Sequence, residues 1–344
     1  MHNNKIFEEN NKEKLLSKSA LHNIKNDDNS NKQELVINSK INSGDKYKIS
    51  IIIPTHNRFD MLIKLLNSIF SQTYTNYEII IIDDVSTDDT NSFFSNLNEE
   101  KIKYIRNNKN LGMGLNRQKG YKIAIGDYVI FCDDDDYYID NEYFKDAVRI
   151  FENKKISLIC SSSYILYEKE NRYEPFILNF SKKIKCIDYL KRFQFDLKKP
   201  TSSFPLIVRK SILDKANFKD MKMMNDSSIY LRSLLVGDYA FANDRIIGVY
   251  RVHSKNDTLN VKADFIIKNM KEKRYVYKSL RKLNIDFDLK KWYREQMKLT
   301  ACHFLYGREK SNLKRMWVLL WILKNVSYSL FKELYRLEME RRRS

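Results

Sequence analysis

Four short strand-like segments alternate with amphipathic segments between residues 48 and 132. Continuous β-branched runs are typical of strands buried on both faces of a parallel sheet. After the first run, apolar residues recur at the spacing of one helix face, at Leu62, Leu65, Leu66 and Ile69. The predicted strands are residues 49–53, 78–82, 101–106 and 128–132, and the predicted helices are residues 62–69, a segment ending at 97, and residues 116–125. This order predicts βαβ units and an open α/β sheet.

The pattern changes on both sides of this region. Residues 1–46 are rich in Asn, Lys, Glu and Ser and lack strand periodicity, so we expect a disordered tail with a transient helix near residues 6–21. Further predicted elements are strands at 156–160, 164–167, 239–242 and 247–251 and a helix at 226–235. From residue 261 to 343 the chain is predicted to be helical and strongly basic. The expected regions are a tail (1–46), an α/β domain (47–258) and a basic helical C-terminal region (259–344).

Charged and polar segments follow three of the four predicted strands, at residues 54–58, 83–89 and 133–136. In open α/β sheets, ligands bind at the carboxyl ends of the strands. Four consecutive aspartates at 133–136 would repel one another unless a cation neutralised them, although a solvated acidic turn is the alternative. Carboxylate oxygens suit Mg²⁺ or Mn²⁺, which also bind phosphate oxygens. The run therefore predicts a metal that bridges a diphosphate.

The net charge of +18 predicts an anionic partner, which could be nucleic acid, a membrane surface or a phosphate-bearing substrate. Much of this charge lies in the terminal regions and no nucleic-acid motif is present, so a nucleic-acid-binding protein is the weaker alternative. A nucleotidyltransferase or other metal-dependent phosphoryl-transfer enzyme is a second alternative, but the P-loop and the Gly-rich nucleotide loop are both missing.

The spacing of the cysteines and the length of the apolar runs indicate where in the cell the protein is expected. The four cysteines lack CxxC spacing, which argues against a zinc module, and Cys132 and Cys160 lie in apolar runs as buried thiols would. The N-terminus has no apolar stretch typical of a signal peptide, and no run is long enough to span a membrane. We therefore expect a cytoplasmic protein.

Four segments resemble, in order and spacing, the motifs of the family 2 glycosyltransferases. They are IIIPTHNR (51–58), EIIIIDDVSTDDT (78–90), NLGMGLNRQKGYKIAIGDYVIFCDDDD (110–136) and NDSSIYLRSL (225–234). The resemblance implies a GT-A fold, a Rossmann-like and mostly parallel sheet flanked by helices. It also implies an inverting enzyme that transfers a hexosyl or N-acetylhexosaminyl group from a nucleotide-diphosphate sugar, with UDP as the expected nucleotide.

The resemblance also implies roles for individual residues. The nucleotide-sugar-binding residues would be Pro54, Thr55, His56, Asn57, Asp84, Arg117, Asp133 and Asp134. The ligands of Mn²⁺ or Mg²⁺ would come from Asp133, Asp135, Asp136 and His253, with Asp135 first and the register within the run open. Each has a structural alternative: Asp84 could serve a helix cap, Arg117 could be a surface helix residue, and His253 could be structural.

Asp226 matches the acidic residue that acts as general base in the family. An inverting displacement needs a carboxylate to take the proton of the acceptor hydroxyl. Asn225 precedes Asp226 where the family more often has Glu, which favours Asp226 over its neighbours as the base. The alternative role for Asp226 is the N-cap of the helix predicted through residue 235.

A short apolar segment at 316–323 lies between Lys314-Arg315 and Lys324. Tryptophans beside basic residues fit a helix in a membrane interface, where anionic lipid attracts the cationic side. A helix docked on the catalytic domain or on a partner subunit fits equally well. In either case we expect a surface-glycan or lipid-linked acceptor and a peripheral position at the inner face of the membrane.

Overall fold

The computed structural model describes residues 34–37, 44–180, 182–221, 223–254, 262–283, 285–307 and 311–343. Most of the predicted tail, including the transient helix near residues 6–21, lies outside these ranges. The division into domains near residue 259 also falls among residues that are not described, and it stays a prediction.

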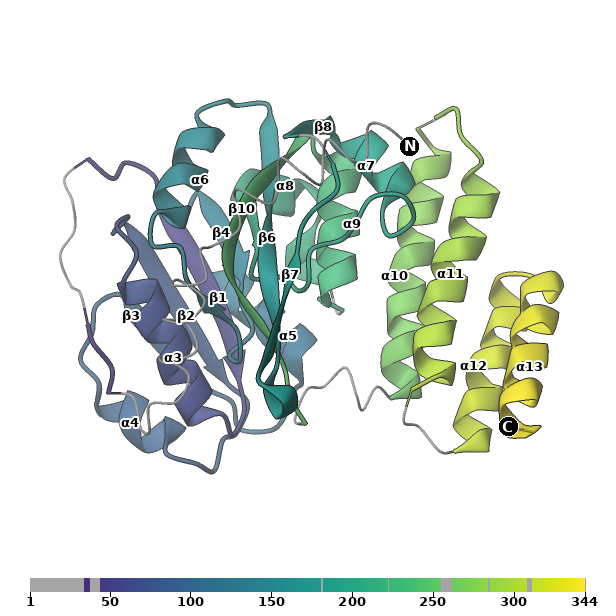
Figure 1. Cartoon of the computed structure of the whole chain (residues 1–344), viewed down its shortest axis with the longest axis horizontal. Coiled ribbons are helices and arrows are strands. Elements are labelled where there is room, and N and C mark those ends of the chain that lie inside the picture. The colour runs from purple at the N-terminus through teal and green to yellow at the C-terminus, as the bar shows by residue number, and fades with distance from the viewer. Residues whose placement is uncertain are drawn as a thin grey trace.

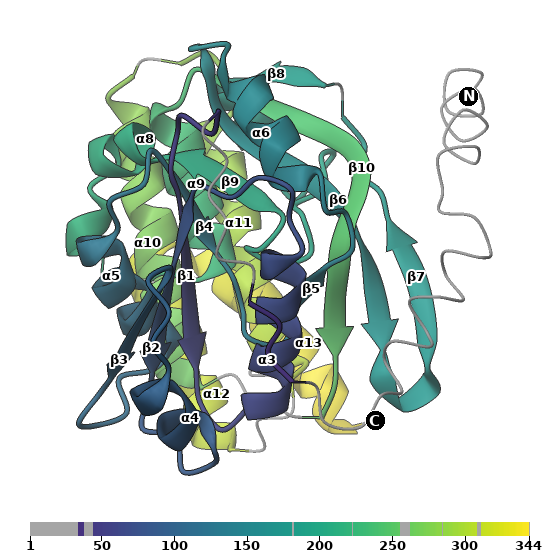
Figure 2. The same cartoon turned by 90° about the vertical axis from the view of Figure 1, so that its left-hand side faces the viewer.

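Within the described residues one mixed sheet forms the centre of the molecule, in the order β3-β2-β1-β4-β9-β6-β10-β5 (Figures 1 and 2). The pairs among β3, β2, β1 and β4 are parallel, as is the β6–β10 pair, whereas β9 runs antiparallel to both of its neighbours. The strands are β1 (Ile49–Thr55), β2 (Tyr77–Asp83), β3 (Ile102–Arg106), β4 (Tyr128–Phe131), β5 (Tyr137–Tyr138), β6 (Ile156–Tyr167), β7 (Arg172–Phe176), β8 (Lys183–Lys185), β9 (Leu206–Arg209) and β10 (Tyr239–Val252). The predicted mixed, mostly parallel sheet is confirmed.

Helices cover both faces of this sheet, as the fully buried strands β1 and β2 require. Along β1, Ile52 faces one hydrophobic cluster, whereas Ile51 and Ile53 face the other. The first cluster includes residues of α5 (Met113–Ile123), α7 (Cys186–Arg192), α8 (Lys210–Lys215) and α9 (Asp226–Val236). The second includes residues of α3 (Phe59–Phe70), α4 (Thr90–Asn96) and α6 (Tyr143–Phe151). The helices predicted in the first half of the chain correspond to α3, α4 and α5.

Two predicted pairs of strands are continuous in the structure. The strands expected at 156–160 and 164–167 form the single strand β6, because Ser161, Ser162 and Ser163 are small enough to be buried between them. The hydroxyl of Ser162 accepts a hydrogen bond from Leu178 N at 3.1 Å, which satisfies this polar group inside the core. The strands expected at 239–242 and 247–251 likewise form the single strand β10. Its pairing with β6 is irregular between these two segments.

The C-terminal helices pack against the α/β fold at the side away from β3 (Figure 1). They are α10 (Ala263–Arg281), α11 (Leu289–Leu305), α12 (Asn312–Asn325) and α13 (Tyr328–Arg343). Trp292 Nε1 of α11 donates to Leu190 O at 3.1 Å, and α10 contacts α9. Their apolar residues belong to the same hydrophobic cluster as α5 and α9, so this region shares its core with the sheet.

Candidate active site

The carboxyl ends of β1 and β4 meet through hydrogen bonds to the aspartate run. Thr55 Oγ1 donates to Asp134 Oδ2 at 2.8 Å, and Arg58 Nη1 donates to Asp134 Oδ1 at 2.8 Å and to Asp135 Oδ2 at 3.0 Å. Both aspartates are buried. Adjacent parallel strands place the start of the Thr55–Arg58 loop beside the aspartates, so this part of the predicted site is assembled.

Arg117 joins the first aspartate of the run to the predicted base. Its guanidinium pairs with Asp133 through Nη2 and lies 3.4 Å from Asp226 Oδ1 through Nη1. It also donates to Met224 O at 2.8 Å and to Ser203 Oγ at 3.0 Å. The side chain is 1% exposed, so the surface-residue alternative for Arg117 is wrong.

Asp226 is the first residue of α9, but it is not the cap of that helix. Asn225 is the N-cap: its side chain accepts from Ser228 N at 3.0 Å, and Ser228 Oγ accepts from Asn225 N at 3.0 Å. This capping box satisfies the helix terminus without Asp226. The capping alternative for Asp226 is therefore wrong. Its side chain, 29% exposed, is directed to Arg117 and Lys199 instead.

The other end of the run contacts β10. His253 Nε2 lies 3.0 Å from Asp135 Oδ2, and His253 itself is buried. Asp136 accepts from Ser202 Oγ at 2.8 Å and from Arg251 N at 3.3 Å. Consecutive aspartates thus have different partners, which distinguishes Asp135 from Asp136.

Burial disfavours the ionised form of Asp133, Asp134 and Asp136 and raises their pKa values. Desolvation raises the pKa of Asp133 to about 7 even though Arg117 opposes the shift. Desolvation likewise raises the pKa of Asp134 to about 6 against the effect of Arg58, and it raises the pKa of Asp136 well above its ordinary value. Additional positive charge near the cluster would favour its ionised form.

The donor set of the cluster fits a divalent cation. Asp135 and His253 provide a carboxylate and an imidazole in direct contact, with the carboxylates of Asp133 and Asp136 on either side in sequence. Within the described ranges, no group of three His, Cys, Asp or Glu side chains converges into a metal site by itself. Mg²⁺-type sites commonly use one or two protein carboxylates and complete the shell with substrate phosphates and water. The residues are therefore consistent with a site that a diphosphate completes.

Asp84 holds the loop between β3 and α5. Its Oδ1 accepts from Asn107 Nδ2 and from Leu111 N, both at 2.8 Å, and its Oδ2 accepts from Gly112 N at 2.8 Å. These contacts give Asp84 a structural role, different from helix capping, beside the nucleotide-sugar contact that the resemblance implies.

The remaining predicted nucleoside residues lie at the edge of the site. Pro54 is buried in β1, whereas His56 and Asn57 are exposed in the loop after it. Asn57 adopts a φ of 54°, and its Oδ1 accepts from Thr87 N at 2.7 Å. That bond joins the loop after β1 to the loop after β2, so the two loops form one continuous edge.

Four contacting residues were not predicted as site residues. Arg58 lies within the motif IIIPTHNR, so its place in the motif was the available signal. Lys199, Ser202 and Ser203 come from a loop before β9 that carries no motif, and Lys199 Nζ lies 3.8 Å from Asp226 Oδ2. Only the fold brings this loop to the aspartates.

A sequence model of the family described as "Glycosyl transferase family 2" matches residues 50–216, which contain the loop after β1 and the aspartate run. The chain carries a family 2 glycosyltransferase domain. The predicted resemblance is thereby confirmed. The chain is similar in fold to a crystal structure of S. aureus TarS residues 1–349 in complex with UDP-GlcNAc, with a TM-score of 0.62, 19% identity and 82% of each chain covered. The predicted GT-A fold is also confirmed.

Curated relatives match parts of this chain. The chain is 38% identical over 117 residues to the Escherichia coli UDP-Glc:alpha-D-GlcNAc-diphosphoundecaprenol beta-1,3-glucosyltransferase WfaP, covering 34% of this chain and 46% of that one. It is 29% identical over 215 residues to the Campylobacter jejuni GalNAc(5)-diNAcBac-PP-undecaprenol beta-1,3-glucosyltransferase, covering 60% of this chain and 65% of that one. A Rickettsia conorii glycosyltransferase is 37% identical over 130 residues, but only 20% of it is covered. The chain thus spans from a fifth to about two thirds of the length of these relatives.

Proposed function

We propose that this chain is an inverting glycosyltransferase that transfers a sugar from a UDP-sugar to a hydroxyl of a lipid-linked or surface-glycan acceptor. The observation that carries this proposal is the Arg117 bridge, because it places Asp226 beside the first aspartate of the run. The name of the E. coli relative supports a UDP-sugar donor. The names of the E. coli and C. jejuni relatives both support an undecaprenol-linked acceptor.

In the proposed reaction, Asp226 takes the proton of the acceptor hydroxyl as its oxygen attacks the anomeric carbon. The new bond joins this oxygen to the anomeric carbon, and the bond from that carbon to the diphosphate breaks with its electron pair on the leaving UDP. Attack from the face opposite the diphosphate inverts the anomeric centre. Arg117 orients Asp226 through its contact with Oδ1.

Asp135 and His253, with Asp133, are the residues we propose to hold Mn²⁺ or Mg²⁺. Asp136 is the weaker choice, because Ser202 and Arg251 N already engage its two oxygens. The bound ion would stabilise the negative charge that develops on the diphosphate as it leaves. Pro54, Thr55, His56, Asn57, Asp84 and Asp134 are proposed to line the nucleotide-sugar side.

The decisive experiment is a panel of nucleotide sugars in which released nucleoside diphosphate is measured with and without Mn²⁺. We expect Asp226→Asn to abolish transfer while UDP binding is retained, and the exposed Asp220→Asn to behave as wild type. Asp135→Ala should lose the metal-dependent part of UDP binding. Normal turnover by Asp226→Asn would end the base assignment, and UDP affinity insensitive to EDTA would end the metal assignment. Release of pyrophosphate would instead identify the nucleotidyltransferase alternative.

We further propose that the outer face of α12 contacts an anionic membrane surface. Leu313, Trp317 and Leu320 are 84%, 49% and 49% exposed at helical spacing, while Val318 and Ile322 pack inward. From residue 262 to 344 the chain has 22 Lys and Arg against nine Asp and Glu, a net +13 of the total +18. Exposed apolar and aromatic residues on a strongly basic region suit a bilayer with anionic lipid. None of the helices in the described part of the chain could span a membrane.

Vesicle flotation tests this surface. Wild-type protein should float with phosphatidylcholine vesicles that contain phosphatidylglycerol, and less with phosphatidylcholine alone. Trp317→Glu should reduce flotation, whereas Leu299→Glu, an exposed position on α11, should not. Equal flotation of both variants and wild type would contradict a role for the α12 face.

A further inference from the structure

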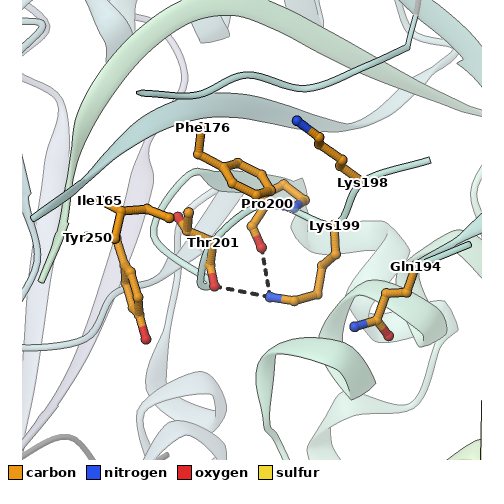
Figure 3. Close-up of a pocket in the computed structure, with 8 residues that line it drawn as sticks. All are labelled: Ile165, Phe176, Gln194, Lys198, Lys199, Pro200, Thr201 and Tyr250. Atoms are coloured by element: carbon orange, nitrogen blue, oxygen red, sulfur yellow. Dashed lines mark hydrogen bonds between the residues drawn. The ribbon is translucent and has the colours of Figure 1, made fainter. Parts of the chain in front are cut away.

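A pocket of about 390 Å³ lies between the loop before β9 and strands β6, β7 and β10 (Figure 3). Its volume falls in the roughly 300–1,000 Å³ range of small-molecule sites. Ile165, Phe176 and Tyr250 supply apolar and aromatic walls, and Lys198 and Lys199 supply its charged groups. Apolar walls with a few placed polar groups are the usual composition of a ligand site.

The pocket adjoins the predicted base. Lys199, one of the lining residues, has its Nζ 3.8 Å from Asp226 Oδ2. Burial raises the pKa of Tyr250, and the carboxylates of Asp136 and Asp226 raise it further, so this phenol also lies within the field of the aspartate cluster. A ligand in the pocket would therefore lie next to Asp226.

The lining residues of the pocket include two lysines and no Asp or Glu. Lys199 Nζ donates to Pro200 O at 2.7 Å and to Thr201 O at 3.3 Å (Figure 3). Lys198 Nζ donates to Ile177 O at 3.0 Å. These backbone carbonyls hold the ammonium groups in place but do not neutralise them. The lining residues therefore bring two positive charges to the pocket, and Asp226 Oδ2 lies 3.8 Å from one of them.

The positive charge of Lys199 is only partly compensated by the carboxylate of Asp226. Its side chain is 15% exposed, and burial lowers its pKa even though Asp226 opposes the shift. The contact with Asp226 is longer than a hydrogen bond, and Arg117 shares the same carboxylate at 3.4 Å. A buried ammonium is stabilised when an anion pairs with it. An anionic group in the pocket would provide that pairing.

We propose that this pocket binds the acceptor and selects a sugar that carries a negative charge, either a phosphate or a carboxylate. The inference rests on the proposed function, since it assigns the acceptor side of the same site. Phe176 and Tyr250 contact the sugar ring, Lys199 pairs with its anionic substituent, and a ring hydroxyl reaches Asp226. A glycosyl diphosphate, such as the acceptor named for the E. coli relative, has this combination of a sugar and an adjacent anion.

The test measures binding to enzyme saturated with UDP and Mn²⁺, so that the donor side is filled. The probes are glucose 1-phosphate, glucuronate and glucose, which share one ring and differ in charge. We expect at least one anionic probe to bind tenfold or more tightly than glucose. Lys199→Met should abolish this preference while UDP affinity is unchanged, and Lys199→Arg should retain it. Lys145→Met, an exposed position on α6, is the matched control and should bind all probes as wild type does.

Each outcome decides the proposal. Preference for glucose 1-phosphate or for glucuronate supports it and identifies the anion. Equal binding of all three probes, or a preference that survives in Lys199→Met, overturns it. Because the readout is binding rather than turnover, equal binding of the three probes by wild-type enzyme that still releases UDP from the donor refutes the acceptor inference alone. Absent donor turnover with an intact preference refutes the proposed reaction instead.

Discussion

Lys273 of α10 provides a quantitative prediction about stability. Its side chain is 3% exposed, and its Nζ donates to Gln296 O of α11 at 3.1 Å. Burial lowers the pKa of this lysine from 10.5 to about 7. Between these pH values the unfolded chain binds a proton that the folded protein does not, so the free energy of unfolding rises with pH. Each tenfold difference in proton affinity corresponds to about 1.4 kcal/mol, so the whole effect amounts to ~5 kcal/mol.

Lys273→Met removes this penalty and keeps an unbranched side chain. Gln296 O loses one donor but still accepts from Thr300 Oγ1 at 3.0 Å, so the substitution leaves the carbonyl with a partner. We expect the variant to be more stable than wild type at pH 7 by up to ~4 kcal/mol. The difference should shrink by about 1.4 kcal/mol for each pH unit from 7 to 10, because the wild type gains stability over this range.

Urea unfolding at several pH values, followed by tryptophan fluorescence, measures the difference. Trp292 is a suitable reporter because it is buried and donates to Leu190 O across the junction of α11 with α7. The matched control is Lys268→Met, a lysine of the same helix whose side chain is 53% exposed, and its effect should be small at every pH. A stability difference between Lys273→Met and wild type that does not change from pH 7 to 9.5 would refute the reasoning.

Three further substitutions test the packing around the site, with thermal or urea unfolding as the measurement. Arg117→Met should destabilise the folded protein by about 3–5 kcal/mol, since it leaves Asp133 without its buried partner. The control Arg149→Met, at an exposed arginine, should be nearly neutral, and equal effects of the two substitutions would contradict the Arg117 bridge. Gly120→Ala should cost about 1–3 kcal/mol, because its Cβ would meet Ile52 Cγ2 at 2.4 Å, whereas Gly44→Ala meets nothing within 4 Å and should be silent. Asn225→Ala should cost about 1 kcal/mol and Asn225→Ser should restore most of it; no loss in the alanine variant would argue against the capping box.

The sequence predicted the first half of the fold well because its strands are buried on both faces. β1 and β2 contain runs of three and four consecutive isoleucines, which favour strands in the interior of a parallel sheet, and the polar residues after them mark the strand ends. The second half was harder to predict, since its strands hold buried polar residues. Ser161–Ser163 interrupted the apolar pattern of β6, and β9 is too short to show periodicity.

The residues of the candidate site likewise fall into a group that the sequence predicted and a group that it did not. Residues that follow β1, β2 and β4 were predictable, because parallel strands bring their carboxyl ends to one edge. The capping of α9 by Asn225 was not predicted, although the sequence Asn-Asp-Ser-Ser contained the signal in its first and fourth residues. Lys199 left no signal, since its role depends on the loop before β9 returning to the site, a long-range contact that local patterns do not encode.

Arg117 explains why the two halves of the site depend on each other. Its partners come from the aspartate run after β4, from the loop before β9 and from the residues around the start of α9, which are distant in sequence. A buried guanidinium is stable only when carboxylates and hydrogen-bond acceptors surround it, so the folding of these segments around Arg117 sets the position of Asp226 relative to Asp133. Lysine at this position could not make the same set of contacts, because a point charge lacks the planar fork of arginine. The geometry of the proposed base therefore follows from the charge balance of the core rather than from α9 alone.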